Sequence, residues 1–353
     1  MTGDRPSPLR LLILGAGAIG GYIGGSLALS GHSITFVDQP AVAAHLKAAG
    51  LRLLLLGREH KVTQAVFTSN LAEALDQGPF DGAIVAVKAY DTPTVLAAVQ
   101  PHSDTFPPLL CLQNGVENES LYSSLLGESR VIAGTVTSPV GRTIDGTPIL
   151  EKLRGVGIAA SHPLAPRLAE AMKHAGLRPR LYTDPQGMKW SKLLTNLLAN
   201  ASAAILNLSP AEIYNDPFLV RLELAQLKEA LHVMRKMKIS VQDLPGTPVR
   251  LLALAANRLP TLLLQPILRR MIGSGRGKKM PSLHIDLYSG REKSEVEFLN
   301  GAVVRAGETV NVPTPVNRWL WQTLLALVER RLPLDRYSRQ PQRVAEELGK
   351  LLL

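Results

Sequence analysis

The feature that most constrains the fold is a glycine-rich turn close to the start of the chain. Residues 9–14 form a short, continuous apolar run, which is typical of a β-strand buried on both faces. Residues 19–29 then have helical spacing, and a second strand is predicted at residues 33–37. The turn between the first strand and the helix consists of Gly15, Ala16, Gly17, Ala18, Ile19 and Gly20. This order of strand, turn, helix and strand predicts a βαβ unit.

The spacing of the three glycines in this turn favours binding of a dinucleotide. Gly15 permits a tight turn, Gly17 lets the backbone approach a pyrophosphate, and Gly20 lets the helix pack closely on the strand. The helix N-terminus offers free N–H groups and a partial positive charge to the phosphates. We therefore predict a Rossmann-type unit whose residues 15–20 contact the cofactor. A purely structural glycine turn is the alternative.

Asp38 stands at the end of the second predicted strand, roughly 20 residues after the turn. An acidic side chain at this place accepts hydrogen bonds from the ribose hydroxyls of the adenosine and repels a 2′-phosphate. Gln39 and Pro40 follow, so no arginine directly after the strand is available to a 2′-phosphate. The sequence therefore favours NADH over NADPH, unless Asp38 is only a turn residue at a strand end.

Hydrophobic periodicity divides the 353 residues into two domains and a tail. Further strands are predicted at residues 83–87, 109–112, 131–135 and 156–160. Residues 9–183 are therefore expected to form an α/β domain with a doubly wound parallel sheet. Helices are predicted at residues 190–206, 217–237, 247–270, 294–306 and 314–331. Residues 184–335 should thus form an all-helical domain, and residues 336–353 a C-terminal tail with a last helix at 341–352.

Composition and charge argue against several classes of protein. The formal net charge is +10, but the basic residues are scattered and aromatic residues make up only 5%, which argues against a nucleic-acid surface. Arginines and prolines interrupt the apolar stretch 251–272, so packing in the helical domain is preferred over membrane attachment. The N-terminal residues lack the apolar core of a signal peptide, and the single cysteine, Cys111, fits a reducing cytoplasm. Cysteines and histidines are not spaced as metal ligands, so no metal is expected.

Three polar residues are spaced along one predicted helix of the second domain. Lys192, Asn196 and Asn200 stand at i, i+4 and i+8, which places them on one stripe among mostly apolar residues. Because asparagine is a mediocre helix former, two of them in line with a lysine favour a hydrogen-bonding role. A satisfied buried amide network and a plain surface stripe are the alternatives.

Several islands of sequence together resemble the ketopantoate reductase family. Besides the glycine-rich turn they are Val87-Lys88-Ala89, Leu112-Gln113-Asn114-Gly115-Val116, Trp190-Ser191-Lys192-Leu193, Ser294-Glu295 and Pro313-Thr314-Pro315-Val316-Asn317. They occur in the order found in that family. The resemblance implies a Rossmann domain followed by a helical bundle, and reduction of the ketone of 2-dehydropantoate to (R)-pantoate in pantothenate biosynthesis. NADPH is the usual cofactor of the family.

The resemblance also implies roles for residues of the second domain. Lys192 would be the proton donor, since an ammonium stabilises and protonates the alkoxide formed when hydride reaches a ketone. Asn196, Asn200 and Ser282 would hold the substrate. Glu295 would orient Lys192 or contact the cofactor or the reacting centre, although a surface carboxylate is its plain alternative.

Two residues of the first domain have implied roles at the cofactor or the reacting centre. Lys88 and Asn114 each follow a predicted strand, where open α/β sheets bind ligands. A solvated strand-end lysine and a simple Asn-Gly turn are the respective alternatives.

Three departures from the family pattern leave a second activity open. Asp38 stands where NADPH-using members carry an arginine, Pro210 replaces a further asparagine, and residues 244–279 are longer than the usual link. An NAD-dependent 2-hydroxy acid dehydrogenase acting on another 2-keto acid is therefore the second hypothesis. A nicotinamide-sensing protein without catalysis would not need the residues implied in substrate binding. A homodimer is a possible assembly.

Overall fold

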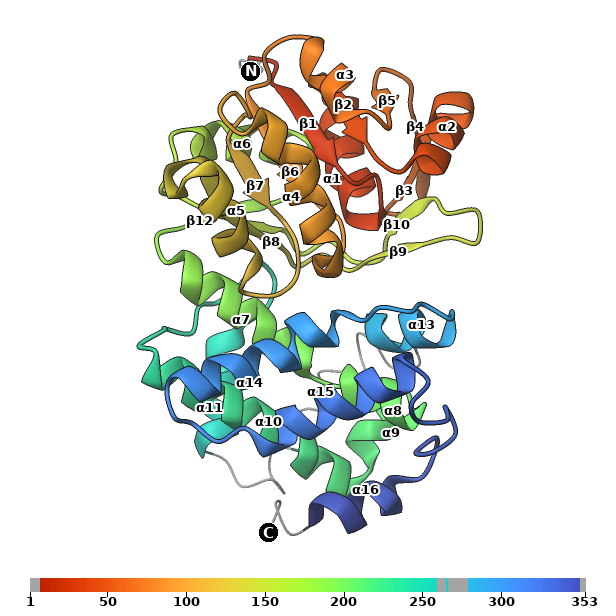
Figure 1. Ribbon diagram of the computed structural model, residues 1–353, viewed down its shortest axis with the longest axis vertical. Helices are drawn as coiled ribbons and strands as arrows, with labels where there is room; N and C mark the ends of the chain where they lie inside the picture. The colour runs from red at the N-terminus through yellow and green to blue at the C-terminus, as the bar shows by residue number, and fades with distance from the viewer. Residues whose placement is uncertain (1–6, 259–264, 266–278, 350–353) are drawn as a thin grey trace. The chain divides into compact units, whose positions relative to one another are not determined.

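The computed structural model describes residues 7–258, 265 and 279–349, which divide into two compact units (Figure 1). The first unit comprises Met1–Lys189 and Leu244–Thr247, and the second comprises Trp190–Asp243 and Pro248–Leu353. The boundary falls inside helix α7 (Pro185–Leu197), whereas the sequence placed it between residues 183 and 184.

An eight-stranded sheet forms the centre of the first unit, and the predicted α/β class is confirmed. The strand order is β12-β11-β8-β7-β6-β1-β2-β5. The strands are β1 (Arg10–Leu14), β2 (Ser33–Val37), β5 (Val66–Thr68), β6 (Gly82–Val85), β7 (Leu109–Cys111), β8 (Val131–Val136), β11 (Val156–Ala159) and β12 (Pro179–Tyr182). Only β8 and β11 pair antiparallel. The sheet is therefore mixed, whereas a parallel sheet was predicted. The order reverses at β1, the place where such sheets bind ligands.

Helices cover both faces of this sheet because alternate residues of a strand point to opposite sides. Leu11 and Ile13 of β1 share a core with α1 (Ala18–Leu29), α2 (Pro40–Ala49) and α6 (Leu164–His174). Leu12 and Leu14 share the opposite core with α3 (Leu71–Asp76), α4 (Thr92–Val99) and α5 (Asn118–Leu126). Three short 3₁₀ helices, η1 (Ala89–Asp91), η2 (Gln100–His102) and η3 (Glu128–Arg130), lie in the connections.

A second, four-stranded sheet packs on α1 and was not predicted. Its order is β4-β3-β10-β9, with strands β3 (Leu51–Leu55), β4 (Arg58–Val62), β9 (Val140–Arg142) and β10 (Pro148–Leu150). Leu51 and Leu53 of β3 and Leu150 of β10 join the core around α1. Because α1 lies between the two sheets it is apolar on all sides, and it lacks the polar face of a surface helix.

The described part of the second unit contains helices and no strand, as predicted. The helices are α8 (Ala201–Leu206), α9 (Pro210–Asn215), α10 (Pro217–Lys236), α11 (Val249–Arg258), α13 (Ser282–Tyr288), α14 (Asn300–Thr309), α15 (Pro315–Val328) and α16 (Pro341–Leu348), with a 3₁₀ helix η4 (Glu295–Phe298). Every residue of α8 is buried, and α13 and α15 pack against it. This short apolar helix is therefore central to the unit.

Two predicted helices differ in the structure. The helix expected at residues 294–306 is divided into η4 and α14, because Leu299 between them leaves the helical region with ψ −89°. Of the helix expected at residues 247–270, α11 covers Val249–Arg258, and apart from residue 265 the remainder lies outside the described residues.

The C-terminal segment, predicted as a tail at residues 336–353 with a last helix at 341–352, packs within the second unit over the part that the structure describes. Tyr337 is buried and meets the ring of Trp319 edge-on at 5.5 Å. Val344 and Leu348 of α16 are also buried. The segment therefore belongs to the helical core.

Two further expectations concern membranes and the cysteine. None of the helices in the described ranges combines the length and the apolar character of a membrane span. Cys111 is fully buried and unpaired in the core formed with α4 and α5, and burial raises the pKa of its thiol. A buried thiol of this kind packs as a small apolar residue.

Candidate active site

The glycine-rich turn of the first unit has the geometry of a phosphate-binding loop. Gly15 has a φ of +98°, and a Cβ there would lie 2.7 Å from Val87 Cγ1, so a side chain is excluded by both conformation and space. A Cβ at Gly20 would lie 1.8 Å from the Gly15 carbonyl oxygen. Gly17 is the N-cap residue of α1, where no side chain caps the helix. The turn therefore leaves the N-terminus of α1 open to an anion.

The remaining residues of the turn lie where the sequence placed them. Ala16 is buried between β1 and α1, whereas Ala18 and Ile19 are half-buried in the first turn of the helix. The Gly15 N–H donates to the Val37 carbonyl at 2.9 Å, which joins the turn to the end of β2.

Asp38 follows β2 and turns its carboxylate toward the glycine-rich turn. One carboxylate oxygen accepts from the Ala16 N–H at 2.6 Å, and the other accepts from the Gln39 N–H at 2.7 Å. Asp38 is half-buried and is therefore held beside the turn while remaining accessible. This placement suits a residue that accepts hydrogen bonds from a ribose.

Lys88 and Asn114 follow neighbouring strands of the sheet. Strand β6 ends at Val85, earlier than predicted, so Lys88 is not a strand-end residue and instead precedes η1. The Gln113 amide donates to the Lys88 carbonyl at 3.3 Å, and this bond joins the two segments. The Asn114 carbonyl accepts from the Asn118 side chain at 2.7 Å, which orders the turn after β7. Both side chains are half-buried.

Lys189 was not singled out from the sequence, although it organises this end of the sheet. Its side chain is 5% exposed and forms an ion pair with Glu119 at 2.7 Å. Its Nζ also donates to the carbonyls of Gln113 at 2.7 Å and Gly134 at 3.3 Å. Burial alone would lower the pKa of Lys189, but the Glu119 carboxylate beside it outweighs burial and raises the pKa. Lys189 thus fixes the segment that carries Asn114.

The second unit holds the polar stripe, but on two helices and not one. Lys192 and Asn196 are half-buried on α7, which ends at Leu197. Ala199 has a φ of +45°, in the left-handed region that ends a helix, and Asn200 becomes the N-cap residue of α8. The single predicted helix at residues 190–206 is therefore wrong.

Glu223 of α10 accounts for this break. Its carboxylate accepts the Ala199 N–H at 2.6 Å, and it is also hydrogen-bonded by Ser202 and by Gln226 at 2.8 Å. Burial raises the pKa of Glu223 to about 7, although these hydrogen bonds oppose the rise. A glutamate within an otherwise helical pattern gave no sequence signal for this role, because its partners are distant in the chain.

Asn200 is a satisfied buried amide and not part of a surface stripe. Its side chain is 6% exposed, donates to the Asn196 carbonyl at 2.9 Å and accepts from the Leu283 N–H at 3.2 Å. These bonds bring the end of α7 against the start of α13. Ser282, the first residue of α13, is exposed beside them.

Glu295 is the first residue of η4 and is 2% exposed, so the alternative of a surface carboxylate is wrong.

Pro210 begins α9, where Ser209 and Glu212 form a capping box. The neighbouring Asn207 is used structurally, since its side chain is hydrogen-bonded to His284 at 2.8 Å.

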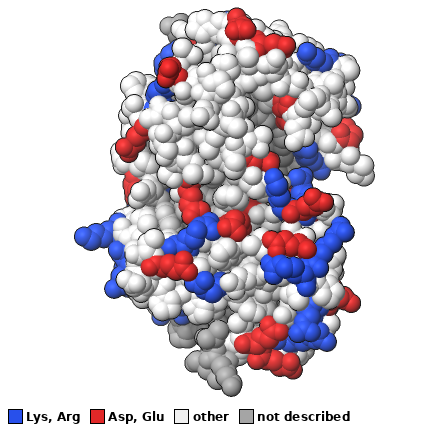
Figure 2. Space-filling model, in the orientation of Figure 1, with Lys and Arg blue, Asp and Glu red and all other residues white. Residues whose placement is uncertain are grey.

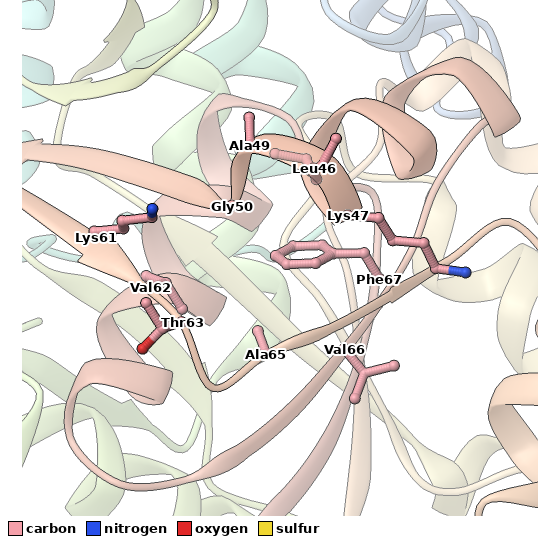
Figure 3. A pocket seen from close by; sticks show the side chains of 11 residues that line it. Leu46, Lys47, Ala49, Gly50, Lys61, Val62, Thr63, Ala65, Val66 and Phe67 are labelled. Atoms are coloured by element: carbon pink, nitrogen blue, oxygen red, sulfur yellow. The ribbon is translucent and has the colours of Figure 1, made fainter.

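A shallow pocket of about 420 Å³ lies elsewhere in the first unit, between the end of α2, β4 and β5 (Figure 3). Lys47 and Lys61 are among its lining residues, and no residue of the glycine-rich turn lines it. The pocket is therefore separate from the candidate cofactor site.

On the face of the molecule that Figure 2 shows, the described basic residues are not gathered in one patch. Figure 2 shows basic and acidic side chains interleaved on the face in view.

The described residues contain no group of three or more histidines, cysteines or carboxylates that could hold a metal ion.

Comparison with known proteins gives concordant results over most of the chain. The family model for ketopantoate reductase PanE/ApbA matches residues 11–156, and its C-terminal counterpart matches residues 184–328. A 2-dehydropantoate 2-reductase of Pyrobaculum aerophilum is 30% identical over 69% of this chain and 75% of its own length. Another, from Archaeoglobus fulgidus, is 28% identical over 90% of this chain and 96% of its own.

Two solved structures share the fold. A PanE/ApbA family ketopantoate reductase from Ralstonia eutropha has a TM-score of 0.77 and 25% identity, covering 92% of this chain and 99% of its own. D-mandelate dehydrogenase, solved with NADH and anilino(oxo)acetate, has a TM-score of 0.76 and 20% identity, covering 93% and 100%. The chain belongs to the ketopantoate reductase family and is an oxidoreductase that uses a nicotinamide cofactor.

Proposed function

We propose that the protein reduces the ketone of 2-dehydropantoate to (R)-pantoate, a step of pantothenate and coenzyme A biosynthesis. The observation that supports the proposal is the set of polar residues in the second unit to which the resemblance to the family assigns proton donation and substrate binding. Lys192 and Asn196 lie on α7, Asn200 caps α8, and Ser282 begins α13 beside Asn200. The relatives named above as 2-dehydropantoate 2-reductases support the same substrate.

Lys192 is assigned as the proton donor. A bound nicotinamide supplies the hydride, and the oxygen of the substrate ketone then carries developing negative charge. The ammonium of Lys192 stabilises this charge and gives the oxygen a proton. Its half-buried position on α7 allows contact with substrate while the helix fixes its backbone.

The other polar residues are assigned to binding and orientation. Asn196 and Ser282 present hydrogen-bonding groups to the carboxylate and the hydroxyl of the substrate. Asn200 already bonds to the Asn196 carbonyl and the Leu283 N–H, so part of its role is to position its neighbours. Glu295, which is almost fully buried, orients the reacting groups.

For the cofactor we propose NADH. The N-terminus of α1 accepts the pyrophosphate, while Lys88 and Asn114 approach the cofactor or the reacting centre. Asp38 beside the turn accepts the adenosine ribose hydroxyls, and its negative charge disfavours the 2′-phosphate of NADPH.

A second candidate is an NAD-dependent 2-hydroxy acid dehydrogenase that acts on another 2-keto acid. Asp38 and the segment before Ser282 favour it, and the NADH-bound D-mandelate dehydrogenase has the same fold. Comparing 2-dehydropantoate with aromatic and branched 2-keto acids at equal concentrations separates the two candidates.

Replacing Lys192→Ala tests the catalytic assignment. Turnover should fall at least about 100-fold, because the proton donor is lost, while the dissociation constant for NADH should change little. Lys228→Ala, at an exposed lysine of α10, is the matched control and should leave turnover unchanged. Retention of turnover in the Lys192 variant would refute the assignment.

A further inference from the structure

Three glycines of α1 form a stripe that faces the second sheet. Gly17, Gly21 and Gly25 are spaced four residues apart and therefore lie on one side of the helix. A Cβ at Gly21 would lie 2.9 Å from Pro148 Cγ, so the sheet approaches the helix closely there. At Gly17, the first position of the stripe, the neighbour is Arg142, whose Nη2 would lie 3.3 Å from a Cβ. The second sheet thus places a guanidinium at the phosphate-binding end of α1.

The hairpin of β9 and β10 holds Arg142 in this position. Arg142 is directly opposite Pro148 in the antiparallel pair, so both side chains leave the same face of the sheet. The next pair on that face, Val140 and Leu150, packs in the core around α1. Arg142 therefore continues an apolar face that is already docked on the helix.

The guanidinium of Arg142 makes no hydrogen bond or ion pair within the described part of the chain. Asp145 in the same hairpin is engaged by Thr143 and Thr147 and forms an ion pair with Arg52 at 3.6 Å. The first turn of α1 contains no acidic residue. A cation beside a helix N-terminus meets the partial positive charge of that helix, so the arrangement favours an anion between them.

We propose that Arg142 is a cofactor-binding residue that contacts the pyrophosphate of the dinucleotide from the second sheet. The proposal rests on binding of the nicotinamide dinucleotide at the glycine-rich turn. The N–H groups of α1 and the guanidinium then hold the phosphates from two directions, and the arginine fork donates to phosphate oxygens. Because Arg142 is exposed, an incoming phosphate can reach it.

Calorimetric titration of the full-length protein with ADP-ribose and with adenosine tests this proposal. Arg142→Gln should weaken ADP-ribose binding about tenfold, the effect of losing one charge-assisted hydrogen bond. Adenosine, which has no phosphate, should bind both proteins equally. Arg142→Lys should be intermediate, because it keeps the charge but loses the fork.

Arg58→Gln, at an exposed arginine of β4 in the same sheet, is the matched control for a change of net charge. It should bind ADP-ribose like the unaltered protein. Equal ADP-ribose affinity in the unaltered protein and Arg142→Gln would overturn the proposal while leaving the cofactor site intact. Absence of ADP-ribose binding by the unaltered protein would overturn the cofactor site and the role of Arg142 together.

Discussion

The buried carboxyl group of Glu223 should make the second unit less stable as the pH rises. Its hydrogen-bond partners, Ala199, Ser202 and Gln226, are all neutral, so no cation compensates the loss of water around an ionised carboxylate. Burial accordingly raises its pKa from an ordinary 4.5 to about 7. In the unfolded chain the same group titrates near its ordinary value.

The difference in proton binding between the folded and unfolded states determines whether the free energy of unfolding rises or falls with pH. Between these two pKa values the folded protein binds more protons at Glu223 than the unfolded chain does, so the free energy of unfolding falls as the pH rises. The effect is complete above the folded-state pKa and absent below the unfolded-state pKa. At about 1.4 kcal/mol per pH unit the total is on the order of 3 kcal/mol.

Urea unfolding followed by tryptophan fluorescence at several pH values between 4.5 and 7.5 measures this effect in about that window. All three tryptophans, Trp190, Trp319 and Trp321, belong to the second unit, so their emission reports on the part of the chain that holds Glu223. Glu223→Gln should remove the contribution of this group to the slope. At acidic pH its absolute stability should be close to that of the unaltered protein, because the amide resembles the protonated carboxyl group: its oxygen can accept from Ala199 and Gln226, and its N–H can donate to Ser202.

Glu346→Gln, at an exposed glutamate of α16, is the control and should keep the original slope. A Glu223 variant that retains the pH dependence of the unaltered protein would contradict the assignment of this dependence to Glu223. An unchanged slope would mean that the carboxylate remains hydrated or paired in the folded state.

Three further predictions concern the first unit. Asp38→Ser should raise the ratio of kcat/KM for NADPH to that for NADH at least about tenfold by removing a negative charge, and an unchanged ratio would contradict the role of Asp38. Lys189→Met should lower the free energy of unfolding by about 3 kcal/mol, because Glu119 is left partly buried without its cation. Adding Glu119→Gln to the same chain should restore part of this free energy. Gly20→Ala should abolish NADH binding in a fluorescence titration, because a methyl group would collide with the Gly15 carbonyl, whereas the control Gly349→Ala, at a glycine with helical φ and open space around it, should still bind.

The first βαβ unit was predictable because its signals are local. Strand, turn and helix are adjacent in sequence, and the three glycines of the motif lie within six residues. The second sheet was missed because β3 and β10 are short and nearly a hundred residues apart, so their pairing has no local signature. Its consequence, the guanidinium of Arg142 at Gly17, was missed for the same reason.

In the second unit, the sequence predicted only part of the local structure around the candidate site. Helical spacing correctly places Lys192 and Asn196 on one helix, but the left-handed Ala199 depends on Glu223, which is distant in the chain. The buried state of Glu295 likewise comes from tertiary packing that a charged local sequence does not indicate. The spacing of residues along the sequence identifies which side chains share one face of a helix. The residues that end a helix or bury a charged side chain are brought to it by the tertiary structure.

Steady-state oxidation of NADH and of NADPH, with and without 2-dehydropantoate, measures the proposed activity of this protein. We predict oxidation that depends on 2-dehydropantoate and is more efficient with NADH, with (R)-pantoate as the product. A protein that binds NADH but does not oxidise it in the presence of 2-dehydropantoate would contradict the proposed substrate, and activity with another 2-keto acid would then identify the second candidate.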